Sequence, residues 1–455
     1  MPKVRTGPLH RPGIIHPYSV PCVKSELDID YVPPTQTEIE KGFLVEFRPI
    51  APIERDQQTP KIEFLIPANA DHYLDLDDMF IKVVLKVTAK KDNTDVVAGD
   101  GTVVNTNYAP VNNLIHSIFS KVEMDLQDKN ITANGQHYAY RAYIEKLLGT
   151  SDIAKKTFLE NSGWYHSRDA IQDDSPSVNS AKKLADGGNT ICLYDRPHLD
   201  MCHQHKLLIN GVQVKIAFQV NDPKFYMLWK SDKVNSLCVS FLHVALFVRH
   251  VRVSDLIMSK HEVYLNKNFA KYQIARNEIR HCIIPKGVFH HSLTDVVNGQ
   301  LPKRVLLFMT DNDASSGNEK KNPFRFKHFN VNHLGCYVNG EQYPSIAYTP
   351  NFGATGIDEP IREYWELYRG LRQYPRPFID LNYEQFKNGF TLFVFNLSPD
   401  CSDGLDAHLN LIKNGNLRFE LKFSVETPNV ISVLFFCEFD SLIQIDKDRN
   451  VATDY

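Results

Sequence analysis

The chain has 455 residues, of which 43% are hydrophobic and 23% charged, and its formal net charge is −3. This length and apolar content allow two sizeable hydrophobic cores, and the small net charge excludes a protein whose whole surface binds nucleic acid. The sequence holds no apolar run near the roughly 20 residues that cross a bilayer. Its first residues lack the apolar centre of a signal peptide, so we expect synthesis in the cytosol and no secretion.

Residues 1–42 differ in composition from the rest of the chain. They contain seven prolines and no acidic side chain before Glu26, and their basic residues include Lys3, Arg5, Arg11 and Lys24. A proline-rich segment of this kind is not expected to alternate or coil into a buried face, which predicts an extended basic arm outside the packed domains. Two outcomes stay open: the arm is disordered, or it becomes ordered on a neighbouring subunit or an acidic surface.

A first domain is predicted over residues 43–253. Its strands include residues 79–88 (MFIKVVLKVT), residues 122–131 with a turn (VEMDLQDKNI), and a final apolar strand over residues 241–253. A helix is predicted over residues 138–148, because apolar side chains recur there at helical spacing, at Tyr140, Ile144, Leu147 and Leu148.

Residues 254–278 are charged and do not alternate, which places a domain junction there. A second domain, residues 279–455, repeats the order of the first. Its elements are strand 304–310 (RVLLFMT), strand and turn 333–342 (HLGCYVNGEQ), helix 359–371 and the final strand 430–445. The apolar face of this helix is predicted from helical spacing at Ile361, Trp365, Tyr368 and Leu371.

The strongest sign of duplication is a pair of similar segments: residues 207–219 read LLINGVQVKIAFQ and residues 411–423 read LIKNGNLRFELKF. In each, the Asn-Gly pair tolerates positive φ and predicts a tight hairpin turn. The strand that follows alternates apolar and polar side chains, as half-buried strands do. Strands in this number, with one helix per half, predict an all-β protein with few helices, built from two tandem β-sandwiches.

Potential metal ligands crowd into the segment PHLDMCHQH, at His198, Cys202, His203 and His205. Their spacing matches no zinc motif, and alternate residues entering a strand point to opposite faces, so a solvated loop is favoured over a metal site. A calcium loop formed by Asp311, Asp313 and Ser315 is rejected because its sixth and twelfth positions are Ser316 and Asn322, not Gly and Glu. The eight cysteines form no Cys-x-x-Cys pair, which predicts reduced, mostly buried thiols.

Common catalytic motifs are missing from the sequence, which has no Gly-x-Ser-x-Gly elbow, no phosphate-binding glycine-rich loop and no His-Glu-x-x-His. The acids that could pair as glycosidase carboxylates are grouped just before one strand, where solvation is favoured: Asp71, Asp75, Asp77 and Asp78. His281, His290 and His291 are interpreted as surface or hydrogen-bonded histidines instead of pH sensors. We therefore predict no catalytic, cofactor-binding or metal-ligating residue, no cofactor, no small-molecule substrate and no enzymatic activity.

Several long blocks of the sequence, in this order, resemble one protein family. They are PPTQTEIEKGFLVEFRPI (33–50), APVNNLIHSIFSKVEMDL (109–126), HYAYRAYIEKLLG (137–149), GQLPKRVLLFMTDNDA (299–314), KKNPFRFKHFN (320–330), NGFTLFVFNLSPD (388–400), GNLRFELKF (415–423) and EFDSLIQIDKDRNV (438–451). The chain from residue 33 onward resembles the major capsid protein of Polinton (Maverick) elements and adintoviruses. That family is similar to the double jelly-roll capsid proteins of virophages, adenoviruses and other large DNA viruses.

The resemblance implies two fused eight-stranded jelly rolls and a hexon-like homotrimer. Such trimers would be pseudo-hexagonal capsomers that tile the icosahedral capsid of a virion, in contact with neighbouring trimers and a minor or penton capsid protein. The arm would then contact an internal membrane or packaged DNA. Two alternatives stay open: a minor or vertex capsid protein, and a carbohydrate-binding or hydrolytic β-sandwich protein.

Two features of the sequence bear on subunit contacts. The 20 tyrosines and 27 phenylalanines exceed what two modest cores require, which predicts aromatic side chains between subunits. The helix at 359–371, with Tyr364, Trp365 and Tyr368, is one candidate surface, although packing against its own sandwich is an equal alternative. Long polar loops are predicted to project outward, at residues 90–110, 162–189 and 339–357.

Overall fold

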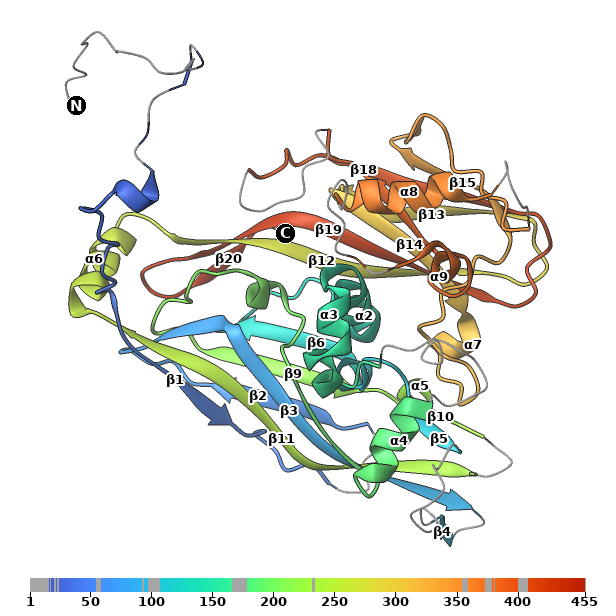
Figure 1. Ribbon diagram of the computed structural model, residues 1–455, viewed down its shortest axis with the longest axis horizontal. Helices are drawn as coiled ribbons and strands as arrows, with labels where there is room; N and C mark the ends of the chain where they lie inside the picture. The colour runs from blue at the N-terminus through green and yellow to red at the C-terminus, as the bar shows by residue number, and fades with distance from the viewer. Residues whose placement is uncertain are drawn as a thin grey trace.

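The structure is a computed structural model that describes residues 16, 18–19, 22, 24–54, 59–91, 94–96, 107–165, 178–230, 234–353, 359–372, 379, 381–399 and 408–454. Two β-sandwiches lie side by side, and the N-terminal segment leaves the first one beside helix α6 (Asp255–Leu265), as Figure 1 shows. Among the described residues, no helix is long and apolar enough to cross a membrane.

The first sandwich consists of two antiparallel sheets. One sheet has the order β1 (Ile39–Phe47), β11 (Ser236–Val253) and β3 (Tyr73–Lys91), and β3 also pairs with β8 (Thr190–Asp195) and β4 (Thr94–Val96). The facing sheet has the order β2 (Lys61–Ile66), β9 (Val214–Val220), β6 (Phe119–Leu126) and β7 (Lys129–Asn130). A small sheet joins β5 (Tyr108–Pro110) to β10 (Met227–Trp229).

The second sandwich has the same two-sheet construction. One sheet has the order β12 (Ala270–Ile284), β19 (Ile431–Ile445), β14 (Arg304–Asp311) and β17 (Leu392–Asn396), and β20 (Val451–Thr453) also pairs with β19. The facing sheet has the order β13 (His290–Gln300), β18 (Asn414–Phe423), β15 (Val331–Val338) and β16 (Glu341–Gln342).

Strand pairing follows one pattern in both sandwiches. When the main strands of each half are counted in chain order, the first pairs with the eighth, the eighth with the third and the third with the sixth. In the other sheet the second pairs with the seventh, the seventh with the fourth and the fourth with the fifth. The first half uses β1, β2, β3, β6, β7, β8, β9 and β11, and the second uses β12 to β19. This is the eight-stranded jelly roll, and its repetition confirms the predicted all-β, double jelly-roll fold.

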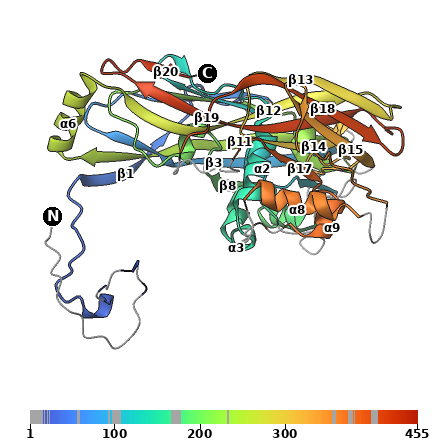
Figure 2. The ribbon, with the colours of Figure 1, turned by 90° about the horizontal axis from the view of Figure 1, so that it is seen from above.

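The helices occupy the connections between strands. They are α1 (Leu114–Ser117), α2 (Tyr138–Gly149), α3 (Asp152–Lys156), α4 (Val178–Asp186), α5 (Pro223–Tyr226), α6, α7 (Asn312–Ser315), α8 (Ile361–Gly370) and α9 (Tyr383–Lys387), with 3-10 turns η1 (Ser25–Leu27), η2 (Phe158–Ser162) and η4 (Asp200–His203). The two predicted helices, α2 and α8, both connect the fifth strand of a roll to the sixth. Figure 2 shows that α3, α8 and α9 lie along the same broad face of the molecule.

The sheet β12-β19-β14-β17 is buried on both faces. In β14, Val305, Leu307 and Met309 face the core of the second roll, whereas Leu306 and Phe308 belong to the core shared with the first roll. This double burial explains the continuous apolar run RVLLFMT, since a strand covered on only one face alternates apolar and polar residues. The two jelly rolls therefore form one packed unit.

An aromatic cluster fills the junction of the two rolls. Tyr143 of α2 stacks on Phe324 of the second roll, with ring centroids 4.2 Å apart and planes 6° apart. Phe324 also meets Tyr140 and Phe225 edge to face, at 5.6 and 5.9 Å. Phe324 and Tyr140 are fully buried, so part of the aromatic content of the sequence is used between the rolls of one chain.

One of the two predicted Asn-Gly turns is wrong. Gly211 does turn, with φ of +76°, but Asn414 and Gly415 lie inside β18 and pair with β13. The tight turn of that sheet is at Asn339 and Gly340, between β15 and β16, where φ is +52° and +88°. A Cβ at position 415 would lie 2.3 Å from Oδ1 of Asn339, so the second Asn-Gly glycine provides space for the turn beside it.

The predicted apolar face of helix α8 is right at Tyr368 and Leu371, which pack in the core, and wrong at Ile361 and Trp365. Ile361 and Trp365 are more than half exposed, whereas Leu367 is fully buried and Tyr364 and Tyr368 pack against the core. The segment predicted as a junction, 254–278, divides into helix α6 and the first part of strand β12, and residues 39–42 of the predicted arm belong to β1. Parts of the three loops predicted to project outward, 97–106, 166–177 and 354–358, lie outside the described residues.

Candidate functional site: a buried polar cluster and the exposed apolar face

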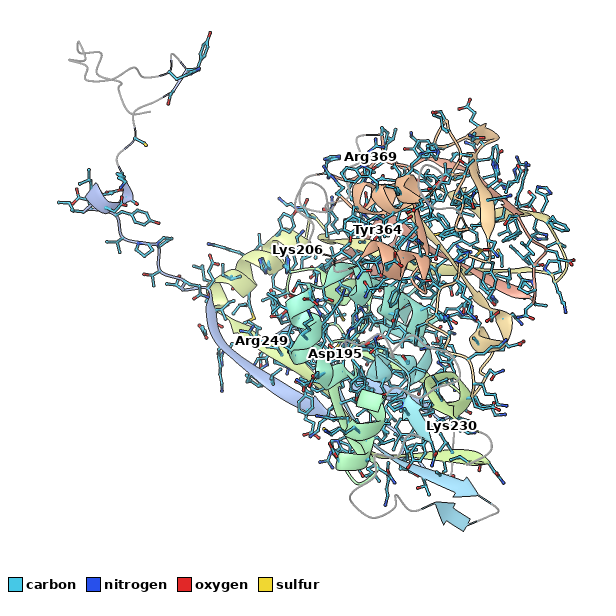
Figure 3. The ribbon with its side chains drawn as sticks, turned by 45° about the vertical axis from the view of Figure 1, so that its right-hand side comes forward. Asp195, Lys206, Lys230, Arg249, Tyr364 and Arg369 are labelled. Atoms are coloured by element: carbon cyan, nitrogen blue, oxygen red, sulfur yellow. The ribbon has the colours of Figure 1, made fainter. Side chains whose placement is uncertain are left out.

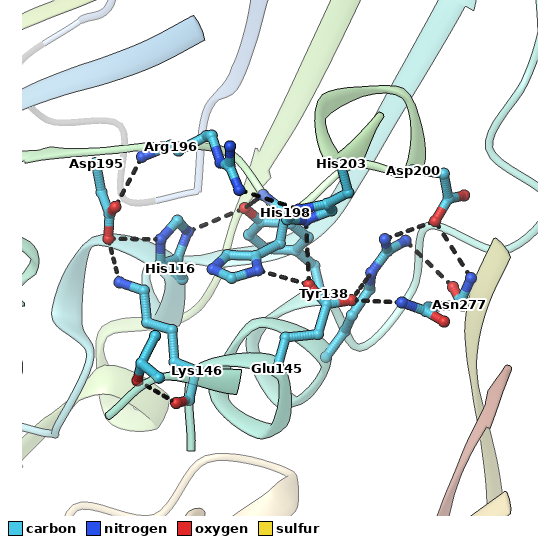
Figure 4. A network of polar contacts seen from close by, with 12 residues as sticks. His116, Tyr138, Glu145, Lys146, Asp195, Arg196, His198, Asp200, His203 and Asn277 are labelled. Carbon is cyan, nitrogen blue, oxygen red and sulfur yellow. Dashed lines mark hydrogen bonds and ion pairs between the residues drawn. The ribbon is translucent and has the colours of Figure 1, made fainter. Parts of the chain in front are cut away.

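A cluster of polar side chains lies where the two jelly rolls meet (Figure 4). We call it the interdomain cluster; it consists of His116, Tyr138, Arg141, Glu145, Lys146, Asp195, Arg196, His198, Asp200, His203 and Asn277. Helix α2 supplies Arg141, Glu145 and Lys146, and it faces the ends of β8 and η4 and the middle of β12. Because Arg141 and Glu145 are four residues apart on a helix, they share one face.

The arginine of this cluster connects the two rolls. Nη2 of Arg141 donates to Asp200 Oδ1 at 2.6 Å and Nε donates to Glu145 Oε1 at 2.8 Å. Nη1 donates to the carbonyl oxygen of Asn277 in β12 at 3.1 Å, and the Asn277 side chain donates back to Glu145 Oε1 at 2.9 Å. Side chains of the first roll are thus hydrogen-bonded to the backbone and side chain of the second. A buried, well-paired group of this kind fixes the relative position of the parts it joins.

The carboxylates on either side of Arg141 differ in their electrostatics. Burial raises the pKa of Asp200 in spite of the nearby guanidinium. Burial also acts to raise the pKa of Glu145, but the Arg141 charge and the contacts with His198 and His203 together hold it well below its usual value. Glu145 is therefore ionised at neutral pH and acts as an acceptor for several donors.

A second group of contacts surrounds Asp195. His116 Nε2 lies 3.1 Å from Asp195 Oδ2, and His116 Nδ1 lies 2.9 Å from the hydroxyl of Tyr138. Lys146 also contacts Asp195 and donates to Asn113 Oδ1 at 3.0 Å. Burial, and then the Lys146 charge, lower the pKa of His116 to about 3. The neutral ring thus donates from Nε2 to Asp195 and accepts at Nδ1 from Tyr138.

The structure brings two of the four sequence candidates for metal binding together, and adds a third residue. Ligand atoms of Glu145, His198 and His203 all lie within 4.8 Å of one another. Cys202 is buried, which raises its pKa to about 12, and it is not in this group. His205 is largely exposed beside Asp77. The Glu145 ligand could not be found from the sequence, because it is more than 50 residues away.

The hydrogen bonds already present oppose a metal at these three residues. The Arg196 guanidinium can only donate, so the Nδ1 of His203 that it meets at 3.3 Å is an acceptor and its proton lies on Nε2. That Nε2 faces Glu145 Oε2 at 3.4 Å, and His198 Nδ1 approaches the same oxygen at 2.6 Å. Arg141 lies between Glu145 and Asp200, Lys146 pairs with Asp195, and the guanidinium of Arg196 pairs with Asp77. Each of these carboxylates already has a basic partner, so the arrangement fits a polar contact between the rolls better than a cation site.

Of the acids predicted to lie just before a strand, Asp75, Asp77 and Asp78 lie inside β3 and form ion pairs, and only Asp71 precedes it. Asp75 and Asp78 lie 3.3 and 3.6 Å from Nη1 of Arg249, and Asp77 pairs with Arg196. Burial raises the pKa of Asp75. Asp71 is exposed, and its backbone N–H donates to Asn69 Oδ1. Asp75, Asp77 and Asp78 thus have basic partners where solvation was predicted, and Asp71 is the solvent-exposed one.

Of the residues that resembled a calcium loop, Asp311 lines a pocket with Lys321, Arg325 and Lys327, whereas Asp313 and Ser315 lie in helix α7. Lys327 Nζ lies 2.6 Å from Asp311 and Lys321 Nζ lies 3.3 Å from Asp313.

The histidines assigned to the surface or to hydrogen bonds have such partners: His281 Nε2 lies 3.0 Å from Ser432 Oγ, His290 Nε2 lies 3.0 Å from Glu420, and His291 lies beside it, partly exposed. The described cysteines are free, and Cys202, Cys336 and Cys437 are buried.

Apolar side chains are exposed on the broad face that carries α3 and α8. Ile153 and Phe158 come from the first roll, and Ile361 and Trp365 come from the second; each is more than half exposed. The tyrosines of α8 face the other way: Tyr364 and Tyr368 both donate to the carbonyl oxygen of Leu381, at 2.9 and 2.5 Å. Figure 3 labels Tyr364 and Arg369 on this helix. Helix α8 therefore packs against its own roll through its tyrosines and exposes Trp365.

No protein-family model matches the chain. The "uncharacterized protein F54H12.2" of Caenorhabditis elegans is 23% identical over 400 residues, which cover 86% of this chain and 93% of that protein.

Solved structures of viral capsids share the fold. The Sputnik virophage structure matches with a TM-score of 0.63 and 12% identity, over 96% of this chain and 93% of that chain. The capsid of PBCV-1 virus matches with a TM-score of 0.59 and 8% identity, over 94% and 99%. The mavirus major capsid protein matches with a TM-score of 0.54 and 10% identity, over 99% and 97%. The chain thus has the double jelly-roll fold of these viral capsid proteins along nearly its whole length.

Acidification is expected to destabilise the protein through His116. Its pKa is about 3 in the folded protein and about 6.5 when unfolded. The unfolded chain therefore takes up the proton first, and the stability present above pH 6.5 is lost as pH falls towards 3. At pH 5 the free energy of unfolding is lower by about 2 kcal/mol because of His116. The pKa of Asp200 is raised in the folded protein, so Asp200 makes the opposite contribution: it favours the folded state as pH falls.

Denaturant unfolding of the protein and of His116→Gln, between pH 7 and about pH 5, measures this effect. The substitution is expected to flatten the pH dependence, whereas His205→Gln, at an exposed histidine, leaves it unchanged. Equal slopes for all three proteins would contradict the assignment to His116.

Proposed function

We propose that this chain is the major capsid protein of a Polinton-like (Maverick or adintovirus) element and acts as a structural protein, not as an enzyme. The observation that carries the proposal is the pair of matched jelly rolls fused in one chain, a fold shared end to end with capsid proteins of DNA viruses. The sequence blocks that resemble the Polinton family support the narrower assignment. The protein would be made in the host cytosol and reside in the capsid of a virion.

The capsomer in this proposal is a homotrimer. Each chain supplies two barrels of the same topology, so three copies around an axis supply six barrels in a pseudo-hexagonal outline that tiles a surface through repeated heterologous contacts. The exposed apolar face formed by Ile153, Phe158, Ile361 and Trp365 is the proposed subunit contact. An apolar surface spread over both rolls is suited to an interface between permanently associated subunits. Neighbouring trimers and a minor or penton capsid protein at the vertices complete the set of partners.

The N-terminal arm, by this proposal, acts on the inner side of the shell. Strand β1 begins at Ile39, and the described residues 24–37 lie outside both jelly rolls. The early basic residues of the arm favour contact with an internal membrane or packaged DNA, in addition to neighbouring subunits.

The homotrimer is tested by light scattering coupled to gel filtration at micromolar concentration. We expect a mass of about 156 kDa, three times the 52.1 kDa of one chain, that persists on dilution because obligate interfaces bury a few thousand Å². A variant lacking residues 1–37 is expected to form the same trimer, because both jelly rolls begin after these residues. A monodisperse monomer at every concentration and salt would contradict the capsid proposal. Turnover of a glycoside, ester or nucleotide that one point substitution abolishes would contradict the structural role.

A further inference from the structure

One part of the proline-rich arm contains no proline and alternates acidic and apolar residues. Residues 26–31 read ELDIDY, in which the acids Glu26, Asp28 and Asp30 alternate with Leu27, Ile29 and Tyr31. In the structure the segment is exposed, and Ser25–Leu27 forms η1. Alternation with period two gives an extended chain one apolar and one acidic face. We call residues 26–31 the ELDIDY segment.

The apolar side chains of the ELDIDY segment are exposed in the described part of the chain. Ile29 is 91% exposed and Leu27 and Tyr31 are about 70% exposed. Figure 1 shows the segment away from both jelly rolls. Three large apolar side chains exposed within five residues are typical of a segment that binds another surface.

An apolar pocket that could accept these side chains lies where the arm joins β1, next to helix α6. It measures about 400 Å³, and its walls include Leu207, Ile209, Val253, Tyr264 and Leu265. We call it the α6 pocket. Tyr264 is half exposed at its mouth, so a ligand reaches apolar side chains there directly. Burying apolar side chains in such a pocket favours a complex because it removes apolar surface from water.

The charges of the α6 pocket match those of the ELDIDY segment. Lys206 and Lys271 are exposed at the pocket, and no carboxylate is among its described lining residues. Lys206 donates to the carbonyl oxygen of Lys271 at 3.0 Å, which holds the two lysines together, and Figure 3 labels Lys206 beside α6. An apolar pocket with two cations at its mouth is complementary to a segment with one apolar face and three acids.

The position of the arm favours the pocket of another copy over its own. Ile39, the first residue of β1, pairs with Val253, which is also a wall of the α6 pocket. The ELDIDY segment begins 13 residues before Ile39, which is up to about 43 Å of extended chain. Pro33 and Pro34 lie between the ELDIDY segment and Ile39 and favour an extended backbone there. An extended connection places the segment away from the pocket of its own chain.

We propose that the ELDIDY segment of one copy binds the α6 pocket of a second copy, with its apolar side chains inside and its acids against Lys206 and Lys271. The proposal rests on the capsid function above, because it requires many copies to be held in fixed neighbouring positions. It assigns the arm a specific acceptor on the protein, in place of a nonspecific contact with membrane or DNA.

The test uses the full-length protein with Tyr31 replaced by the photoreactive residue benzoylphenylalanine. Protein grown with a heavy nitrogen isotope is mixed with an equal amount of unlabelled protein, dissociated and reassembled, and then illuminated. Mass spectrometry of the cross-linked peptides is expected to find residue 31 joined to peptides containing Tyr264 or Lys271, in pairs that combine heavy and light chains. Cross-links only within one copy, cross-links to other surfaces, or none at high micromolar concentration would each overturn the proposal.

Charge reversal provides a second measurement that does not disturb folding. Lys271 is exposed, so Lys271→Glu is expected to keep the fold while lowering the cross-link yield about tenfold. Combining it with Asp30→Lys is expected to restore the yield, and Lys260→Glu, on α6 but outside the pocket lining, serves as the matched control. Unchanged yields in all variants would also contradict the proposal. Loss of cross-linking with an intact trimer mass counts against this inference alone, whereas a monomer counts against the capsid function.

Discussion

Replacing Arg141 with alanine is expected to lower the free energy of unfolding by about 3–5 kcal/mol. Arg141 is buried and holds both Asp200 and Glu145 through short hydrogen bonds. Without it, two buried carboxylates lose their counter-charge, and Asn277 of the second roll loses the donor to its carbonyl oxygen. Equilibrium unfolding in urea, followed by tyrosine and tryptophan fluorescence, measures the change.

Arg369→Ala is the matched control for this substitution. Arg369 also pairs with a glutamate on its own helix, Glu366 at 3.0 Å, but its side chain is 64% exposed. Exposed pairs of this kind contribute about 0–1 kcal/mol. If Arg141→Ala were no more costly than Arg369→Ala, the interdomain cluster would not hold the two rolls together. A much larger loss of stability in Arg141→Ala than in Arg369→Ala would support the interdomain cluster as a contact that holds the two rolls together.

Replacing Phe324 with alanine is expected to cost about 3–5 kcal/mol and to destabilise both jelly rolls together. The ring of Phe324 is fully buried between the rolls and stacks on Tyr143 at 4.2 Å, so its removal leaves a cavity in the shared core. Because that core is continuous from one roll to the other, we expect a single cooperative transition for the whole chain. Differential scanning calorimetry measures both the shift in Tm and the number of transitions.

Phe289→Ala provides the comparison, since this phenylalanine is 57% exposed on the second roll. It is expected to change stability by less than about 1 kcal/mol. Two separate transitions, with only the later half of the chain affected by Phe324→Ala, would show that the rolls fold independently. Independent rolls would contradict the inference that the sheet containing β14 belongs to both cores.

Rigid coupling of the rolls has a consequence for the proposed capsid. A trimer has a pseudo-hexagonal outline only if the angle between the two barrels of each chain is constant. Apolar packing keeps the two rolls in contact, but it has no strong preference for one relative orientation. The hydrogen bonds of the interdomain cluster add direction, because Arg141 and Asn277 each meet fixed partners. By the capsid proposal, the cluster would keep the angle between the two barrels of each chain constant.

Sequence patterns determined the local elements of this protein. The alternation in residues 79–88, 333–342 and 411–423 reflects strands covered on one face, and helical spacing identified α2 to within a residue. The repeated order of strands and helix predicted two similar sandwiches. These features depend on neighbours a few residues away, so their physical causes are contained in short stretches of sequence.

Only the tertiary structure decided which surfaces meet. Strand β14 reads as one apolar run, and nothing local indicates that Phe308 faces the first roll while Leu307 faces the second. The interdomain cluster joins α2, the end of β8, η4 and β12, with partners up to 136 residues apart. Helix α8 exposes Trp365 because Leu367 and the tyrosines occupy the surface offered by its roll. Burial and pairing at such distances depend on how complete sheets and helices pack, so they have no signature in the period of any single segment.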